Sequence, residues 1–131
     1  MNIAVRYYSK SGHTQAVAKA IAEAVNATEL SVDSSDAVIT TLTDVLFIGS
    51  ALYAYGIDSH MKDYLKTVKK ELVKKVVIFS TSWVSKHAIA IIKKELTSVG
   101  IEVASEFFYV RNKPSEEKLQ EAKEFAKKFI Q

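Results

Sequence analysis

The sequence predicts an α/β fold: a doubly wound, five-stranded parallel sheet in the order 2-1-3-4-5, with helices on both faces. Segments with the pattern of strands alternate with segments of helical periodicity along the whole chain. Two strand segments, 45–49 and 76–79, are continuously apolar, which is typical of strands buried on both faces. Because crossover connections are right-handed, helices on both faces favour a doubly wound sheet, and five strands fit this order best.

Five segments have the composition of strands, and about five helices are expected to alternate with them. The expected strands cover approximately residues 2–8, 29–32, 45–49, 76–79 and 102–109. Most of them are rich in β-branched and aromatic residues. The stretch 33–43 is short and weakly patterned, so it holds either a small helix or only a turn.

Apolar residues at helical spacing predict the helices and the faces that they bury. The first helix, residues 15–25, is rich in alanine and can approach the sheet closely. A later helix begins after Asp58 or Ser59 as N-cap, the next stops at Gly100, and the last begins after Ser115 as N-cap. The apolar stripes comprise Val17, Ile21 and Ala24; Met61, Leu65, Val68 and Leu72; Ala88, Ile92, Leu96 and Val99; and Leu119, Ala122, Ala126 and Phe129.

Length and composition predict one globular domain, residues 1–131. No run of ~20 apolar residues is present to span a membrane, and no secretory signal pattern starts the chain, so we expect a cytoplasmic protein. We also expect a monomer or a weak dimer. Because the chain has no cysteine, disulfides and thiol redox chemistry are excluded. A redox role would therefore need a bound cofactor.

The net charge of +3 is a mild excess, too small to indicate nucleic-acid binding by itself. Basic residues interleaved with exposed aromatic residues, which nucleic-acid modules show, are absent, so no nucleic-acid partner is expected. The lysines gather near helix ends, where they suit the helix dipole. Two interpretations stay open: the lysines form a solvated face, or they dock an acidic partner protein.

A hydroxyl-rich loop between the first strand and the first helix is the most informative motif. It reads Ser9-Lys10-Ser11-Gly12-His13-Thr14. Unpaired N–H groups and the partial positive charge of a helix start can hold a phosphate there, with hydroxyls around it. The loop lacks the GK[ST] ending of a nucleoside-triphosphate loop and the three-glycine dinucleotide fingerprint. A phosphate site is one interpretation, and a polar turn without a ligand is the other.

The order of the strands brings three loops together at the carboxyl edge of the sheet, where ligands of such folds bind. The loop after the first strand is joined there by the loops after the third and fourth strands. These loops read Ser50-Ala51-Leu52-Tyr53-Ala54-Tyr55-Gly56-Ile57-Asp58 and Ser80-Thr81-Ser82-Trp83. Together they supply hydroxyls, two tyrosines and the only tryptophan of the chain. Aromatic rings stack on a planar ligand and hydroxyls bind a phosphate, so the three loops suit a planar, phosphorylated aromatic ligand.

With these motifs, the whole chain resembles a short, single-domain member of the flavodoxin family. The family's FMN-phosphate loop often reads Ser/Thr-x-Ser/Thr-Gly-Asn/His-Thr, which the sequence at 9–14 matches. The resemblance implies a flavodoxin-like fold, FMN as cofactor and redox proteins as partners. It also implies that residues 50–56 cover one face of the isoalloxazine ring and that residues 80–83 lie on the other.

The resemblance leaves the role of single residues open. Tyr53, Tyr55 and Trp83 are the aromatic candidates, and which of the two tyrosines stacks is not decided. Either tyrosine also fits as a packing residue, and Trp83 fits as an outer cap of the following helix. In the family a peptide of the second loop rotates to bind the reduced flavin N5; Gly56 fits this role, and Ala54 is the alternative.

The histidines point to no metal site. His13 reaches a phosphate either with its side chain or with its backbone N–H alone. His60 and His87 stand near helix starts and are expected on the surface. A metal site needs ligands that converge, and no two histidines share a suitable spacing, so we predict no metal.

The leading interpretation is an FMN-binding electron-transfer flavoprotein, because the resemblance implies that the flavin does the chemistry. The alternative is a flavodoxin-like oxidoreductase that acts on a quinone or a porphyrinogen-like substrate, since loops of the Ser-Ala-Leu-Tyr-Ala type are similar to those of that group. That enzyme would need a substrate-facing base, and none stands out. Many flavodoxins are acidic, whereas this chain is slightly basic, and Asp58 is the acid nearest in sequence to the expected flavin. The departure argues against a very low reduction potential and against the usual partners of the family.

A signalling receiver domain shares the predicted topology but not its chemistry. That class needs an acidic pair after the first strand and an acceptor aspartate after the third. The chain has Tyr7-Tyr8 and Gly49-Ser50 at these places. Topology alone therefore supports this class, and the site does not.

Overall fold

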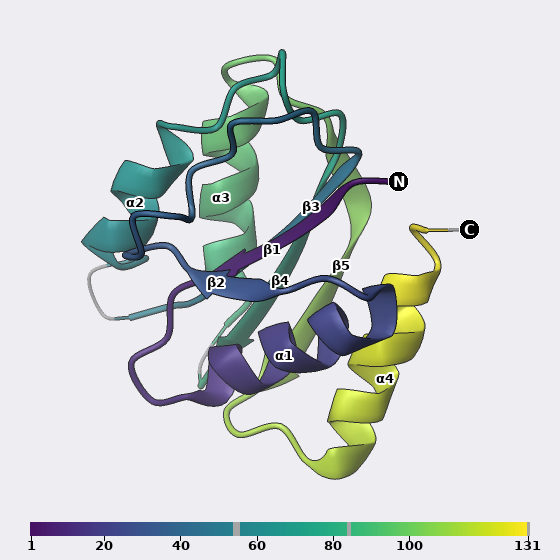
Figure 1. Ribbon diagram of the computed structural model, residues 1–131. Helices are drawn as coiled ribbons and strands as arrows, with labels where there is room; N and C mark the ends of the chain where they lie inside the picture. The colour runs from purple at the N-terminus through teal and green to yellow at the C-terminus, as the bar shows by residue number, and fades with distance from the viewer. Residues whose placement is uncertain (54–55, 84, 131) are drawn as a thin grey trace.

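The computed structural model describes residues 1–53, 56–83 and 85–130 (Figure 1). The described part of the chain forms five strands and four helices, and a helix follows every strand except the second. In order these are β1 (Ile3–Tyr7), α1 (His13–Val25), β2 (Glu29–Ser31), β3 (Val45–Ala51), α2 (Ser59–Leu65), β4 (Val76–Ser82), α3 (His87–Thr97), β5 (Val103–Arg111) and α4 (Glu116–Lys127).

All neighbouring strands pair in parallel, and their order is β2-β1-β3-β4-β5, which confirms the predicted doubly wound sheet. The register pairs Tyr7 with Gly49 and Ser50 with Ser80. The carboxyl ends of the central strands therefore lie side by side at one edge. β2 and β5 are the two edge strands.

Two helical layers cover the two faces of the sheet, as Figure 1 shows: α1 and α4 lie on one side and α2 and α3 on the other. Successive residues of a strand point to opposite faces, and β3 follows this rule. Leu46 and Ile48 belong to the core beneath α2 and α3, whereas Phe47 belongs to the core beneath α1 and α4. All three are fully buried, as the continuous apolar pattern of this strand predicts.

Close packing at the centre of the sheet requires a glycine at position 49. A Cβ atom at Gly49 would overlap the ring of Phe79 on the adjacent strand. Phe79 is itself fully buried beneath α1 and α4. A larger residue at position 49 would therefore force the phenylalanine ring out of its place.

The prediction of about five helices is one too many, because the segment 33–43 forms turns and irregular structure. Its Ala37 carbonyl accepts hydrogen bonds from the Arg6 Nε, at 2.7 Å, and from the Tyr64 hydroxyl, at 2.5 Å. Ala37 is fully buried, and Arg6 and Tyr64 are buried as well. Side chains of the core thus satisfy this backbone group, and a helix is not needed to do so.

Two helices end earlier than their apolar stripes predict. α2 stops at Leu65, where the Thr67 hydroxyl donates to the Tyr64 carbonyl at 2.7 Å and competes with the helical pattern. Val68 nevertheless stays buried. α3 stops at Thr97, and Val99 is 55% exposed, so its place in the predicted stripe is wrong.

The predicted N-caps of two helices are confirmed. Asp58 is the N-cap of α2, and its carboxylate accepts from the His60 N–H. Ser115 is the N-cap of α4, and its hydroxyl accepts from the Lys118 N–H at 3.1 Å. Each cap satisfies a backbone donor that has no partner within its helix.

β3, β4 and β5 extend two or three residues beyond their predicted ends. Pairing of Ser50 with Ser80 and of Ala51 with Thr81 continues the ladder toward the carboxyl edge. The Ser80 hydroxyl donates to the Ser50 carbonyl at 2.7 Å. Small polar residues are therefore part of the sheet here, and they carry the ladder into the region where the site lies.

Among the described residues, no helix combines the length and apolar character that crossing a membrane requires.

Candidate functional site

A pocket of about 190 Å³ opens at the carboxyl edge of the sheet. It draws on all three predicted loops and on a fourth segment that follows β5. The lining residues are Ser11 and His13; Ala51, Leu52 and Tyr53; Thr81, Ser82 and Trp83; and Asn112. The topology thus brings the predicted loops to one place.

The first loop turns tightly into α1. Gly12 has a φ of 92°, in the left-handed region that favours glycine, and it is the N-cap of the helix. The Ser9 hydroxyl accepts from the Gly12 N–H at 2.9 Å, and the Ser11 hydroxyl accepts from the His13 N–H at 3.4 Å. α1 begins at His13, two residues earlier than predicted. Ser11 and His13 line the pocket, so it lies beside the start of α1, where backbone N–H groups have no partner within the helix.

Thr14 has a different environment from the rest of the loop. Its side chain is buried, and its hydroxyl lies 2.6 Å from the Thr81 hydroxyl. The two residues are 67 positions apart in sequence, so this hydrogen bond fastens the first turn of α1 to β4. The Thr14 hydroxyl thus already has a protein partner, and no local pattern in the sequence predicts this contact.

Backbone hydrogen bonds join two residues of the second loop. Tyr53 and Gly56 exchange two backbone hydrogen bonds, of 2.7 and 3.0 Å, and Gly56 has a φ of 105°. Ala54 and Tyr55, which the sequence analysis placed in the cofactor site, lie outside the described residues. Tyr53 is half-buried and lines the pocket. Because of this positive φ, a side chain at position 56 would strain the backbone.

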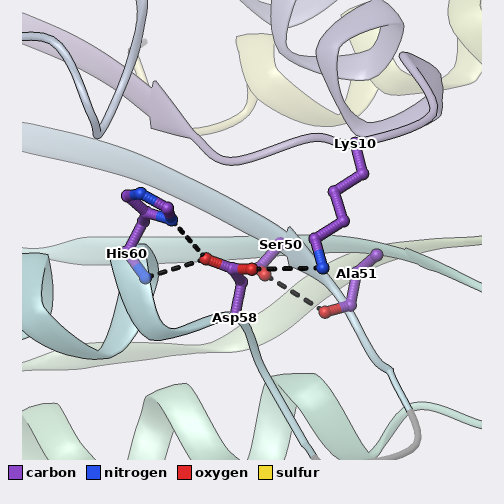
Figure 2. Close-up of polar contacts among 5 residues, drawn as sticks. All are labelled: Lys10, Ser50, Ala51, Asp58 and His60. Atoms are coloured by element: carbon purple, nitrogen blue, oxygen red, sulfur yellow. Dashed lines mark hydrogen bonds and ion pairs between the residues drawn. The ribbon is translucent and has the colours of Figure 1, made fainter.

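Lys10 links the first loop to the second. Its ammonium lies 4.6 Å from the centroid of the Tyr53 ring. It also lies 3.5 Å from the Asp58 Oδ2 (Figure 2). The other carboxylate oxygen of Asp58 accepts from the His60 N–H at 2.8 Å and lies 2.7 Å from the His60 Nδ1. One carboxylate therefore connects the loop before α1 with the start of α2.

Asp58 is buried, with only 5% of the residue exposed. Burial alone would raise the pKa of its carboxyl group, but hydrogen bonds from the His60 N–H, from the imidazole and from Lys10 outweigh it. The pKa of Asp58 therefore lies below its ordinary value. The acid that the sequence analysis singled out is ionised at neutral pH and is balanced by cationic or donor groups.

His60 is exposed, as predicted, but its ring is held from two sides. Besides the Asp58 contact, it stacks on Tyr8 with ring centroids 4.8 Å apart and an interplanar angle of 10°. His87 is also exposed. Within the described ranges, no three His, Asp or Glu side chains gather as a metal site would require.

Ser50 and Ser80 lie within the sheet and are fully buried. The Ser50 hydroxyl donates to the Ala51 carbonyl at 3.1 Å, and the Ser80 hydroxyl is bonded to the Ser50 carbonyl. Their hydroxyls thus satisfy backbone groups of the sheet. Ala51, Thr81 and Ser82, in contrast, lie at the strand ends and line the pocket.

Trp83 stands at the rim of the pocket with 63% of its surface exposed. The Arg111 guanidinium carbon lies 5.7 Å from the tryptophan ring, and the Arg111 Nε donates to the Trp83 carbonyl at 3.1 Å. Arg111 therefore contacts both the carbonyl of Trp83 and one face of its ring. An exposed aromatic face at a pocket rim is suited to stack on a planar ligand.

The segment after β5 also borders the pocket and was not predicted as part of the site. Asn112 lines the pocket, has a φ of 63°, and its N–H donates to the Ser82 carbonyl at 3.0 Å. Asn is one of the few residues that accept this left-handed conformation. The predicted strand ended too early, at Tyr109, so Arg111 and Asn112 were not placed beside the fourth strand's end.

The donors and the apolar surfaces of the pocket fit a phosphorylated planar group. Ser11 and His13, at the start of α1, line the pocket, and a helix start suits an anion. Tyr53 and Trp83 also line the pocket and offer aromatic surface. The same pocket therefore has donors for a phosphate and rings for an aromatic system.

Comparison with known proteins identifies the family. The family model described as a flavodoxin domain matches residues 4–128, which is nearly the whole chain. The chain therefore belongs to the flavodoxin family. It is an electron-transfer flavoprotein, and the family implies a flavin cofactor. No sequence among curated proteins matches it.

Solved structures share the fold at low sequence identity. A flavodoxin from the domain Archaea is 22% identical, with 100% of both chains covered and a TM-score of 0.81. Flavodoxin 1 from Bacillus cereus is 19% identical, with 99% of this chain and 97% of that chain covered and a TM-score of 0.80. The Flv1 flavodiiron core from Synechocystis is 19% identical; 98% of this chain but 35% of that chain is covered, with a TM-score of 0.81. The fold thus occurs both alone and within longer proteins.

Proposed function

We propose that the flavin is FMN, bound without a covalent bond, and that the protein carries electrons between redox proteins. The observation that carries the proposal is one pocket lined by the turn at the start of α1 and by Tyr53 and Trp83. A phosphate site alone would suit many ligands. Aromatic residues in the same pocket favour a phosphorylated ring system.

The phosphate would lie at the first loop and the first turn of α1. Helix N–H groups and the positive end of the helix dipole favour an anion there. The positive φ of Gly12 lets the backbone turn sharply into the helix, so that these N–H groups converge. The proposed phosphate-binding residues are Ser9, Lys10, Ser11, Gly12, His13 and Thr14.

The ring would lie between the second and third loops. Tyr53 and Trp83 line the pocket from the ends of two adjacent strands, which supports stacking from both. Gly56 is joined to Tyr53 by two backbone hydrogen bonds. The proposed residues around the ring are Ser50, Ala51, Leu52, Tyr53, Ala54, Tyr55, Gly56, Ser80, Thr81, Ser82 and Trp83. Among them, the buried Ser50 and Ser80 would act through the backbone that they position.

The bound flavin supplies the redox chemistry by accepting and releasing electrons. The chain would place it and set the charge around it. Asp58 is the acid of the second loop, and its pairing with Lys10 balances a charge that would otherwise oppose added electrons. The arrangement supports a less strongly negative reduction potential than an acidic surround would give.

A substitution at Ser11 tests the phosphate site. Ser11 is exposed and lines the pocket, so Ser11→Glu should fold while placing a carboxylate where the phosphate belongs. Ser11→Gln is the matched control, because glutamine has nearly the same size without the charge. FMN titration followed by flavin fluorescence should show a Kd at least tenfold higher for Ser11→Glu than for Ser11→Gln. Equal affinities of the two variants would refute the assigned loop.

An electron carrier and an enzyme are distinguished by whether the FMN-loaded protein alone catalyses repeated turnover of a substrate. A carrier should not sustain reduction of a quinone by a nicotinamide donor unless a reductase is added. Steady consumption of the donor by the FMN-loaded protein alone would instead support the oxidoreductase interpretation.

A further inference from the structure

A row of cations and aromatic rings runs along α3 and the edge strand β5, beginning at the pocket. We call it the cationic strip and define it as Trp83, Lys86, Lys93, Phe107, Tyr109 and Arg111. It belongs to the side of the sheet that α2 and α3 cover (Figure 1).

Two cations of the cationic strip, Lys86 and Arg111, lie over its rings. The Lys86 ammonium is 5.6 Å from the Phe107 centroid and 5.7 Å from the Tyr109 centroid. Arg111 covers Trp83 in the same manner, at 5.7 Å. Such contacts hold long side chains in place, so less side-chain freedom is lost when a partner binds.

The cationic strip exposes apolar surface next to its charges. Phe107 is 40% exposed on a strand that has no neighbour on its outer side. It borders an apolar groove of about 240 Å³ between α3 and β5, which Ile89, Lys86 and Lys93 also line. Apolar surface with a charged rim is typical of protein-binding sites.

The ionisable groups of the cationic strip that carry formal charge all have the same sign. Nearby acids in the described chain lie elsewhere: Glu106 points to the other face of β5 and pairs with Lys128 at 3.2 Å. Glu95 follows Lys93 by two positions, which is about 200° around the helix. The charge of the strip is thus not neutralised within the described residues that form it.

The cationic strip is continuous with the cofactor pocket, because Trp83 lines the pocket and is also the first residue of the strip. A protein seated on the strip would therefore lie beside the proposed flavin. A second copy of this chain is a poor occupant, since two strips of the same sign repel each other and the net charge is +3. Charge complementarity favours an acidic protein.

We propose that the cationic strip is the docking surface for an acidic redox protein, which exchanges electrons with the flavin across Trp83. The proposal rests on the proposed function for the presence of the flavin. Docking itself does not need the cofactor, so the two can fail separately.

The test uses plastocyanin, an acidic copper protein, as the probe. The FMN-loaded and FMN-free proteins, labelled with ¹⁵N, are titrated with the Cu(I) form at low and moderate salt. The largest chemical-shift changes should fall on residues 83, 86, 93, 107, 109 and 111, and the Kd should rise with salt. Cytochrome c, a basic protein, should cause no such pattern.

Charge reversal separates the effect of the cationic strip on binding from the effect of the net charge of the protein. Lys86→Glu/Lys93→Glu should raise the Kd for plastocyanin at least tenfold. The matched control is Lys19→Glu/Lys127→Glu, which makes the same change in net charge on exposed residues of α1 and α4, on the opposite side of the sheet. Its Kd should stay within threefold of the unsubstituted protein.

Each electron that leaves the reduced protein should convert one Cu(II) of plastocyanin to Cu(I). The rate constant of this transfer should fall in Lys86→Glu/Lys93→Glu and stay nearly unchanged in the control variant. An equal loss of affinity for plastocyanin in the two double variants would overturn the proposal. Chemical-shift changes spread over the whole surface would overturn it as well. FMN affinity, measured separately, should be the same in both variants. If the unsubstituted protein bound no FMN yet docked plastocyanin on the strip, the proposed cofactor would be wrong and the docking surface right.

Discussion

The ammonium of Lys10 lies 3.5 Å from the carboxylate of Asp58, and this ion pair joins the loop before α1 to the N-cap of α2. The carboxylate is the buried member, with 7% of its side chain exposed, against 49% for the lysine. Because Asp58 also caps α2 through the His60 N–H, one side chain fixes the positions of two segments that border the site (Figure 2).

Asp58→Asn should lower the free energy of unfolding at pH 7 by about 1 kcal/mol, since a charged cap and its ion pair are lost. The pKa of Asp58 is below its ordinary value of 3.8 in the folded protein. Its ionised form therefore stabilises the fold above that value, and this contribution is lost as the pH falls through the lower, folded-state pKa. Urea unfolding at pH 7 and near pH 3 should show the difference between the two proteins shrinking at the lower pH.

Asp63→Asn is the control for that measurement, because Asp63 is an exposed aspartate of the same helix. It should change the stability little at either pH. A stability difference for Asp58→Asn that stays constant between the two pH values would contradict the role given to the ionised carboxylate.

Trp83→Leu should weaken FMN binding by about 3- to 10-fold, which corresponds to the loss of one stacked aromatic pair. Phe107→Leu removes an exposed ring that does not line the cofactor pocket, and it should leave the FMN affinity unchanged. Trp83 is the only tryptophan, so its fluorescence reports on the site alone. FMN should quench this emission in the unsubstituted protein; unchanged emission at saturation would place the flavin elsewhere.

Gly49→Ala should lower the free energy of unfolding by about 1–3 kcal/mol, because the added methyl group overlaps the Phe79 ring in a closely packed core. Phe79→Leu removes that ring edge. Thermal or urea unfolding of the double variant should therefore show less destabilisation than the sum of the two single changes. Additive effects would show that the two positions do not interact.

Tyr64→Phe should cost about 1 kcal/mol of stability, the net value of a buried hydrogen bond to the Ala37 carbonyl. The Arg6 Nε still donates to the same carbonyl, so the segment 33–43 should keep its conformation. Amide hydrogen exchange should rise modestly around Ala37 while the sheet stays protected. Stability equal to that of the unsubstituted protein would mean that the tyrosine hydroxyl contributes nothing.

The strands could be predicted because buried parallel strands are recognisable as continuous apolar runs such as 45–49, and their number and right-handed crossovers then favoured the observed order. Periodicity misjudged where strands end, since Ser50, Ser80 and Ser82 are polar yet continue the ladder through small side chains. It also predicted a helix too many, because nothing local in the sequence reveals that Arg6 and Tyr64 bind the Ala37 carbonyl.

The candidate site also has parts that the sequence predicts and parts that it does not. The loop 9–14 could be found because it lies between a strand and a helix start, and three loops met because their strands are neighbours. The Lys10–Asp58 pair, the Thr14–Thr81 hydrogen bond and Asn112 could not be found in this way. Each joins residues that are far apart in sequence and whose side chains have no local pattern.

The central claim is that the loop 9–14 holds the phosphate of a flavin. Titration of the protein with FMN and with riboflavin, which lacks the phosphate, tests it most directly. We expect FMN to bind with a Kd below about 1 μM and riboflavin to bind at least a hundredfold more weakly, a difference of about 2.7 kcal/mol. Equal affinity for the two flavins, or no binding of FMN at micromolar concentration, would contradict the claim.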